Sequence, residues 1–413
     1  MSKEIDSLSN ATELLELAER LEDDDNLEEA LEAAEKAIKL DPQNGKAWCK
    51  KAELLLDMDK PTEAYQILVK ACEDMPENTD CIFELGAFSS EHGNLNQACG
   101  CFHKVYQLNP NYPRIKINLG YDLLKMGIFK DAIKYLEEAL EDDLSDMDRA
   151  RVLNRLGEAH MNNLDPQDPE NEHEANREQL EKAKECFDKS LQLDDKEYVP
   201  VGNIAMCYVR LGDPEEAVKI LEPVLEKFPN EARLYIINGI SLSFIKDRQK
   251  EAVASFEKAI ELDPKDPELW FHKAHYYVRR NDFGTAIEIF KEAISKHPES
   301  GELHLNLGSL LRHVGNMQES IMYHRKGLQL LNRLVHYGFF LVDENNKPLE
   351  EGRVAMESDR IIPREKVAAQ FLAQLKEQGH EIDDKGIVDG KYRIGMKELS
   401  PDEITFKENV KVL

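Results

Sequence analysis

The chain has 413 residues, with 81 acidic and 53 basic side chains and a formal net charge of −28. So acidic a composition argues against sequence-independent binding to nucleic acid or to anionic membranes, because both need a basic face. A hydrophobic content of 41% suffices for a core, while a charged fraction of 32% indicates a protein with much exposed surface.

The start of the chain has neither the basic residues nor the apolar stretch of a secretory signal. No run of about 18 apolar residues occurs, so no transmembrane helix is expected. The seven cysteines are scattered and include no CxxC pair, which is typical of proteins in a reducing compartment. We therefore expect a cytoplasmic protein whose residues 1–10 form an N-terminal tail.

From residue 11 onward the chain repeats at intervals of 34 residues. Prolines mark the period, since 34 residues separate Pro42 from Pro76, Pro76 from Pro110, and Pro264 from Pro298. An alanine or valine stands five positions before each of these prolines, and an alanine stands seven positions earlier still. A fixed period of this length predicts stacked supersecondary units.

The repeated pattern resembles the tetratricopeptide repeat, which has a large apolar residue at position 4, Gly or Ala at position 8, Ala at positions 20 and 27, and Pro at position 32. Nine such repeats cover residues 11–334. The eighth repeat is the most complete, with Trp270, Ala274, Tyr277, Ala286, Phe290, Ala293 and Pro298 in place. The resemblance implies antiparallel helix pairs that stack into a right-handed, all-α solenoid in which each repeat contacts only its neighbours.

The fifth repeat contains an insertion near 161–175. Gly157 and Ala183 are 26 residues apart, where the pattern has 12, and residues 162–182 carry a net charge of −5. We expect an acidic loop, followed by a helix that is extended over Glu174–Lys189. The alternatives are a tolerated surface insertion without a role and a lid or partner contact.

Residues 335–413 do not follow the repeat, and we expect a small C-terminal α+β module there. A proline near the start of its expected helix and a glycine after the end support that helix, and an Asp-Gly pair indicates a tight hairpin turn. The expected elements are a β-prone run at Tyr337–Val342, a helix at Pro363–Gln378, the hairpin turn at Asp389–Gly390, and strands at Glu403–Phe406 and Val410–Leu413.

Signatures of catalysis are missing from the sequence. There is no phosphate-binding glycine loop, no HExxH, no GxSxG and no dinucleotide fingerprint. His272 and His275 lie three residues apart, but no cysteine or matching carboxylate accompanies them, so we expect no metal site and no cofactor. The alternatives to an adaptor are an enzyme or effector whose C-terminal module is active while the repeats serve as a targeting arm, and a structural protein that self-associates.

The resemblance also implies where a partner binds. In the family the first helix of each repeat lines a concave groove, and positions 2, 5, 6, 9, 12 and 13 meet a peptide or a partner helix. Here these positions are acidic near the N-terminus, where residues 1–44 carry a net charge of −10. In repeats four to seven they are basic and amide-rich, namely Arg114, Asn118, Lys125, Arg151, Asn154, Arg155, Asn203, Arg210 and Arg233.

Arginine suits carboxylates and asparagine suits peptide backbone, so these residues predict binding of an acidic or C-terminal segment of a partner protein. Chaperone-binding members of the family use a dicarboxylate clamp of five residues. Asn118, Arg151 and Arg155 match three of them, whereas Phe83 and Ala87 replace the first pair. The alternative is that the arginines only lie on a solvated face of an acidic, co-chaperone-like scaffold.

Overall fold

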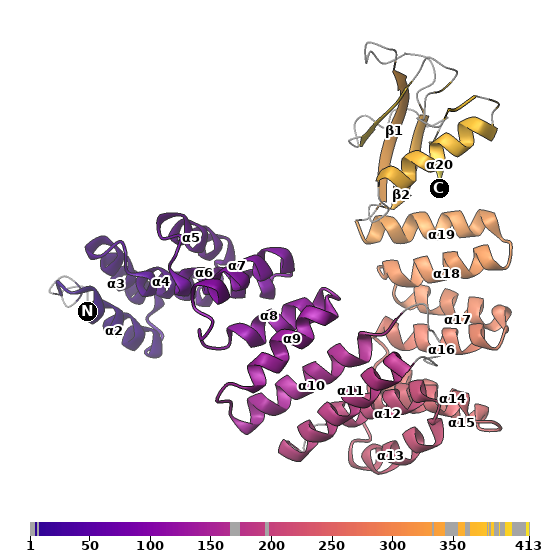
Figure 1. The fold of residues 1–413 in the computed structure, drawn as a ribbon, viewed down its shortest axis with the longest axis horizontal. Coiled ribbons are helices and arrows are strands. Elements are labelled where there is room, and N and C mark those ends of the chain that lie inside the picture. The colour runs from indigo at the N-terminus through magenta and orange to yellow at the C-terminus, as the bar shows by residue number, and fades with distance from the viewer. Residues whose placement is uncertain are drawn as a thin grey trace. The chain divides into compact units, whose positions relative to one another are not determined.

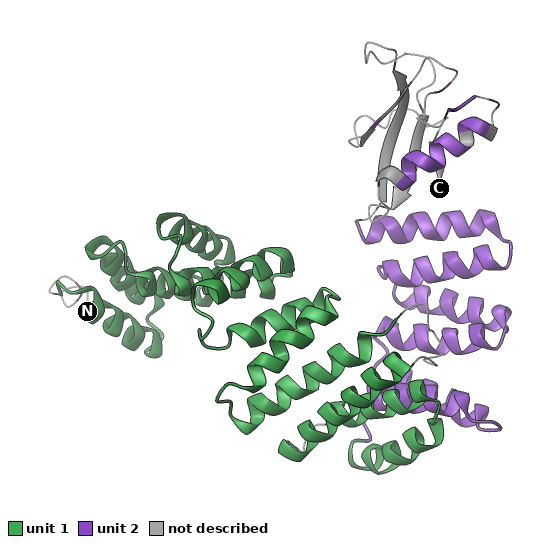
Figure 2. Cartoon of the chain, in the orientation of Figure 1, with its two compact units in different colours: residues 1–228 green, residues 229–413 purple. Residues whose placement is uncertain are grey.

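The computed structural model describes Ile5 and residues 8–165, 174–194, 198–332, 334–342, 354–359, 364–377, 379, 381–383, 388, 393–398 and 410–412. The chain divides into two compact units, residues 1–228 and 229–413 (Figure 2). The predicted all-α solenoid is confirmed, since nine helix pairs follow one another from α2 to α19 (Figure 1). We call the first helix of each pair its A helix and the second its B helix.

In the first unit the helices are α2 (Ala11–Asp23), α3 (Leu27–Leu40), α4 (Gly45–Asp57), α5 (Pro61–Asp74), α6 (Thr79–Glu91), α7 (Leu95–Leu108), α8 (Ile115–Lys125), α9 (Phe129–Leu140), α10 (Asp146–Asn162), α11 (Glu174–Leu193), α12 (Val199–Leu211) and α13 (Pro214–Lys227). In the second unit they are α14 (Ala232–Phe244), α15 (Gln249–Leu262), α16 (Pro267–Arg279), α17 (Phe283–Lys296), α18 (Gly301–His313), α19 (Met317–Leu330) and α20 (Arg364–Glu377).

Small residues at position 8 let the two helices of a repeat approach each other. A Cβ added to Gly86 in α6 would lie 2.8 Å from the ring of Phe102 in α7, and one added to Gly157 would lie 2.6 Å from the ring of Phe187. Gly120, Gly239 and Gly308 meet the large residue at position 24 of their own repeats in the same way. These contacts explain why the repeat pairs a small residue with a large one, as close packing requires.

The core runs along the array between the A and B helices. Fully buried alanines at positions 20 and 27, such as Ala64 and Ala71, alternate with fully buried large side chains such as Phe102 and Phe187. Each large buried side chain contributes about 1.5–3 kcal/mol of hydrophobic stabilisation. Side-chain hydrogen bonds link successive repeats, as where the Tyr112 hydroxyl donates to Asp80 over 2.8 Å.

The insertion in the fifth repeat leads into a long B helix. α11 begins at Glu174, as predicted, and has 20 residues. The amide of Asn176, which is buried, accepts a hydrogen bond from the backbone N–H of Asp165 over 2.8 Å and donates to the carbonyl of the same residue. The residues between these two ends, 166–173, lie outside the described part of the chain.

Beyond α19 the described residues include four strands and α20. The strands are β1 (Leu334–Val342), β2 (Val354–Asp359), β3 (Arg393–Glu398) and β4 (Val410–Val412), in the order β3-β1-β2-β4. β1 is antiparallel to β2 and β3, and β4 is parallel to β2. The predicted turn at Asp389–Gly390 and strand at Glu403–Phe406 lie outside the described residues. That residues 335–413 are a module separate from the array stays a prediction.

None of the helices among the described residues is both long and apolar enough to cross a membrane.

Candidate protein-binding face

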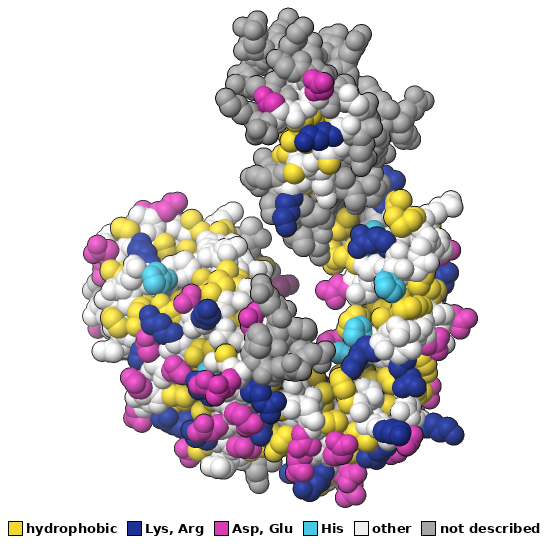
Figure 3. Space-filling model, turned by 45° about the vertical axis from the view of Figure 1, so that its right-hand side comes forward, with side chains coloured by type: hydrophobic (Ala, Val, Ile, Leu, Met, Phe, Trp, Pro, Cys, Tyr) yellow, Lys and Arg dark blue, Asp and Glu magenta, His cyan; other side chains and the backbone are white. Residues whose placement is uncertain are grey.

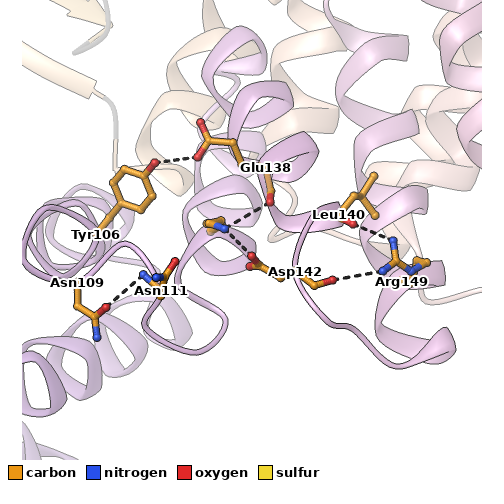
Figure 4. Close-up of polar contacts among 8 residues, drawn as sticks. Tyr106, Asn109, Asn111, Glu138, Leu140, Asp142 and Arg149 are labelled. Carbon is orange, nitrogen blue, oxygen red and sulfur yellow. Dashed lines mark hydrogen bonds and ion pairs between the residues drawn. The ribbon is translucent and has the colours of Figure 1, made fainter.

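The A helices of repeats four, five and six lie in contact along the first unit, α8 against α10 and α10 against α12. A network at the start of α10 fixes its position (Figure 4). The guanidinium of Arg149 donates to the carbonyl of Leu140 over 2.8 Å and to that of Asp142 over 3.3 Å. Lys116 of α8 pairs with the Asp142 carboxylate over 2.5 Å. The ends of α8, α9 and α10 are therefore held together where the candidate site begins.

Three predicted arginines interact with Asp148 or Tyr121 where α8 and α10 lie together. Arg114, just before α8, donates to the carboxylate of Asp148 over 2.9 Å. The guanidinium of Arg155 lies 5.7 Å from the ring centroid of Tyr121, which is within the range of a cation–π contact. Burial raises the pKa of Tyr121, and the positive charges of Arg155 and Arg151 oppose this rise. We call Arg114, Arg151 and Arg155 the arginine cluster.

Asp148 ties the cluster to the N-terminus of α10. The hydroxyl of Ser145 donates a hydrogen bond to its carboxylate over 2.9 Å. That bond lowers the pKa of Asp148, and the charges of Arg114 and Arg151 add to the effect. Asp148 is consequently an anion at neutral pH that neutralises only part of the positive charge of the cluster.

The arginine cluster keeps hydrogen-bond donors for a ligand. The side chains of Arg114 and Arg155 are 63% and 48% exposed, and each uses one nitrogen in an ion pair, Arg155 with Glu158 over 2.7 Å. Arg151 is exposed and has no ion pair among the described residues. Since a guanidinium carries five N–H donors, ion pairs with the described residues use only a few donors of the cluster, and the others can bind an additional carboxylate.

The predicted amides lie on the same helices. Asn118 is half-buried on α8, one helical turn after Arg114. The side chain of Asn203 on α12 is buried and donates to the amide oxygen of Asn154 on α10 over 3.5 Å. The side chains of Asn118, Asn154 and Asn203 thus extend the polar face from the arginine cluster toward repeat six. The amide of Asn203 already makes a hydrogen bond within the fold.

The remaining predicted residues differ in their availability. Arg210 is half-buried and donates to the carbonyl of Met161 over 2.7 Å, and burial lowers the pKa of its guanidinium. It therefore holds α12 against α10. Lys125 is 58% exposed and lies 3.6 Å from the buried carboxylate of Asp122. Arg233 is exposed on α14 in the second unit.

The A helices of repeats one to three present the opposite charge. Lys50 pairs there with Glu22 over 2.5 Å and with Glu53 over 2.9 Å. Burial raises the pKa of Asp57, and Glu22 and Glu53 raise it further. Burial likewise raises the pKa of Glu84, with an added effect of Glu53. The face formed by the A helices of the first unit is acidic over α2, α4 and α6, and carries the arginine cluster on α8 and α10.

Only part of a dicarboxylate clamp is present. Phe83 occupies a clamp position of repeat three. Its ring centroid lies 5.5 Å from that of Phe102 and 5.0 Å from that of Tyr112, so this side chain packs in the core. Tyr121 is not among the predicted site residues, although it occupies position 9 of repeat four, which is one of the groove positions of the family. Asp148 precedes the first position of its repeat, so no positional signal marks it.

His272 and His275 on α16 make local contacts. His272 Nε2 lies 3.6 Å from the carboxylate of Glu268, and burial lowers the pKa of both His272 and His275. Most of the histidine side chains visible in Figure 3 lie on this unit. In the part of the chain that the structure describes, no three His, Cys, Asp or Glu side chains are grouped so that they could hold a metal ion.

Five family models described as tetratricopeptide repeat match residues 11–54, 117–190, 176–236, 241–266 and 255–288, together just over half of the chain. The human protein O-mannosyl-transferase TMTC3 is 26% identical over 68% of this chain and 30% of its own length. The mouse interferon-induced protein with tetratricopeptide repeats 2 is 26% identical over 38% of this chain and 35% of its own. The chain thus spans about a third of the length of these two relatives.

A crystal structure of a tetratricopeptide repeat protein from Parabacteroides merdae is similar to 64% of this chain and 98% of that one, with 17% identity and a TM-score of 0.45. The matched family models lie in both units, within the array of helix pairs from α2 to α17. The chain belongs to the tetratricopeptide repeat family.

Proposed function

We propose that this protein is a non-enzymatic, cytoplasmic adaptor that holds an acidic or C-terminal segment of a partner protein against α8, α10 and α12. Proteins of this family are generally scaffolds for protein interaction. The observation that carries the proposal is the arginine cluster, in which one cation just before α8 and two on α10 act on Tyr121 and Asp148. A chain with a net charge of −28 gathers positive charge at this place.

The geometry suits a carboxylate ligand. Arginine can bind a carboxylate through two parallel N–H donors, and such charge-assisted bonds are stronger than neutral ones. Arg151 has no ion pair within the described part of the chain, while Arg114 and Arg155 are oriented by Asp148 and Tyr121. A bound carboxylate would also relieve the repulsion among three neighbouring cations. These features support a site for acidic side chains or for a terminal carboxylate.

The acidic face of repeats one to three sets the direction of the ligand. Carboxylates on α2, α4 and α6 repel an acidic segment, so its negative charges are favoured only over α8 and α10. The half-buried Asn118 and Asn154 lie beside the cluster and suit the peptide backbone. We therefore expect the partner segment to be acidic at one end and neutral or basic at the other.

A peptide-display selection tests this proposal. The wild-type protein is compared with Arg151→Glu/Arg155→Glu and with a control, Lys130→Glu/Lys134→Glu, that makes the same change in charge on exposed positions of the B helix α9. Wild type and control are expected to enrich acidic peptides, and the arginine variant is not. Equal enrichment by all three proteins, or no acidic preference in wild type, contradicts the proposal.

A further inference from the structure

Two cysteines from successive repeats lie next to each other. The sulfur of Cys49 in α4 is 3.9 Å from that of Cys81 in α6, and the two residues are 32 positions apart in the chain. Cys81 is fully buried in a cluster with Trp48 and Met75, and Cys49 is partly exposed at the edge of that cluster. All seven cysteines are free thiols in the structure.

We propose that Cys49 and Cys81 form a thiol-oxidation site, which joins α4 to α6 by a reversible disulfide in the presence of a small disulfide such as oxidised glutathione. A disulfide bond is about 2.04 Å long, so the sulfur atoms must approach by about 1.9 Å. The two helices are already in contact, and side-chain rotation with a small helix shift supplies this approach.

The order of the reaction follows from exposure. The thiolate of Cys49, the partly exposed residue of the pair, attacks one sulfur of oxidised glutathione, forming a mixed disulfide and releasing one glutathione thiolate. Cys81 then loses its proton and attacks Cys49 Sγ, breaking the bond to the second glutathione. Two electrons and two protons pass from the pair to the oxidant, which leaves as two molecules of glutathione.

The hydrogen bond within the pair affects the two steps in opposite ways. Cys49 donates it to Cys81, which lowers the pKa of Cys81; the same bond, together with burial, raises the pKa of Cys49. Cys81 is the better anion of the two, but it is buried, so it suits the second, intramolecular attack. The first step at Cys49 is accordingly slow, because only a small fraction of this thiol is ionised at neutral pH.

The disulfide would connect two repeats across their boundary. Closing the segment between these residues restricts the unfolded chain, which stabilises the folded one. We expect the melting midpoint of the first unit to rise by roughly 5 °C or more on oxidation. Cys49 and Cys81 lie on α4 and α6, whereas the arginine cluster lies on α10 and just before α8, so the proposed disulfide uses none of the residues of the proposed binding site.

The test uses the full chain. Reduced protein is incubated with oxidised glutathione without denaturant, alkylated and digested, and the disulfides are mapped by mass spectrometry. Wild type and the control Cys72→Ser are expected to yield a peptide crosslinked between Cys49 and Cys81 and a higher melting midpoint, and a thiol reductant reverses both. In Cys49→Ser and Cys81→Ser the crosslink and the shift are lost.

Three results would overturn the proposal: glutathione that stays on Cys49, a crosslink that uses Cys72 in place of Cys81, or seven thiols that remain free. Because Cys81 is buried, its serine variant is checked for folding by circular dichroism. Cys49→Ser, at the partly exposed position, keeps the test decisive if Cys81→Ser unfolds.

Discussion

Substituting Gly86 by alanine probes the packing that explains the repeat pattern. Gly86 lies in the middle of α6, and a Cβ there would be 2.8 Å from the ring of Phe102, which is only 1% exposed. The centroid of this ring lies 5.5 Å from that of Phe83, so the ring cannot move without disturbing the core. Alanine favours the helix by about 1 kcal/mol over glycine, but overpacking at this contact costs about 2 kcal/mol. We therefore expect a net loss of about 1 kcal/mol in the free energy of unfolding.

Gly100, in the B helix of the same repeat, provides the matched control. It is exposed within α7, and a Cβ added there meets nothing within 4 Å. Gly100→Ala should therefore raise the free energy of unfolding by about 1 kcal/mol, since only the helix preference acts. The two alanine variants should differ by about 2 kcal/mol, which is the overpacking cost alone.

Urea denaturation followed by far-UV circular dichroism measures both variants. The free energy of unfolding should fall with urea concentration at the same slope in all variants. Relative to wild type, the urea midpoint should be lower for Gly86→Ala and higher for Gly100→Ala. If Gly86→Ala is as stable as Gly100→Ala, the position 8 glycine is not needed for close helix contact, and the packing explanation of the repeat fails.

Two further predictions concern hydrogen bonds in the array. The indole N–H of Trp48 donates to the carbonyl of Pro42 over 3.0 Å, whereas that of Trp270 is buried without a hydrogen-bond partner among the described residues. Trp48→Phe should thus lower the free energy of unfolding by about 1 kcal/mol more than Trp270→Phe does in urea denaturation; equal losses would contradict this. The pKa of Asp148 lies below its ordinary value of 3.8, chiefly because Ser145 donates to it. The stabilisation from this bond is present above the pKa of the unfolded chain and is lost as the pH falls through the lowered value. An NMR titration of Asp148 should give a midpoint below 3.8 in wild type and a higher one in Ser145→Ala, and an unchanged midpoint would refute the role of the hydroxyl.

The helix pairs could be predicted because their spacing reflects a physical requirement. A small residue at position 8 and a large one at position 24 must meet in every repeat, and the contact of Gly157 with Phe187 persists even though the fifth repeat has an insertion between them. The start of α11 at Glu174, nine residues before Ala183, was expected as an extension of the helix and not from the period, because the B helices α5 and α17 begin three residues before the corresponding alanine. Residues with a strict spatial role thus leave a readable period.

The availability of the site residues could not be predicted. Lys125 and Arg210 occupy the same position in repeats four and six, yet one is 58% exposed while the other is half-buried and bonded to the carbonyl of Met161. Position in the repeat indicates the face of the helix but not the distance to the next helix. The contact of Cys49 with Cys81 was missed because pairs were sought at short spacing, while neighbouring repeats bring together residues 32 positions apart.

The most direct test of the binding proposal is the affinity for one acidic peptide taken from the display selection. Fluorescence anisotropy measures its dissociation constant for wild type, for Arg151→Glu/Arg155→Glu and for the α9 control Lys130→Glu/Lys134→Glu. Loss of two charge-assisted contacts should weaken binding to the arginine variant by at least roughly tenfold, while the control stays within about twofold of wild type. Equal affinity for all three proteins would show that the peptide does not bind at the arginine cluster.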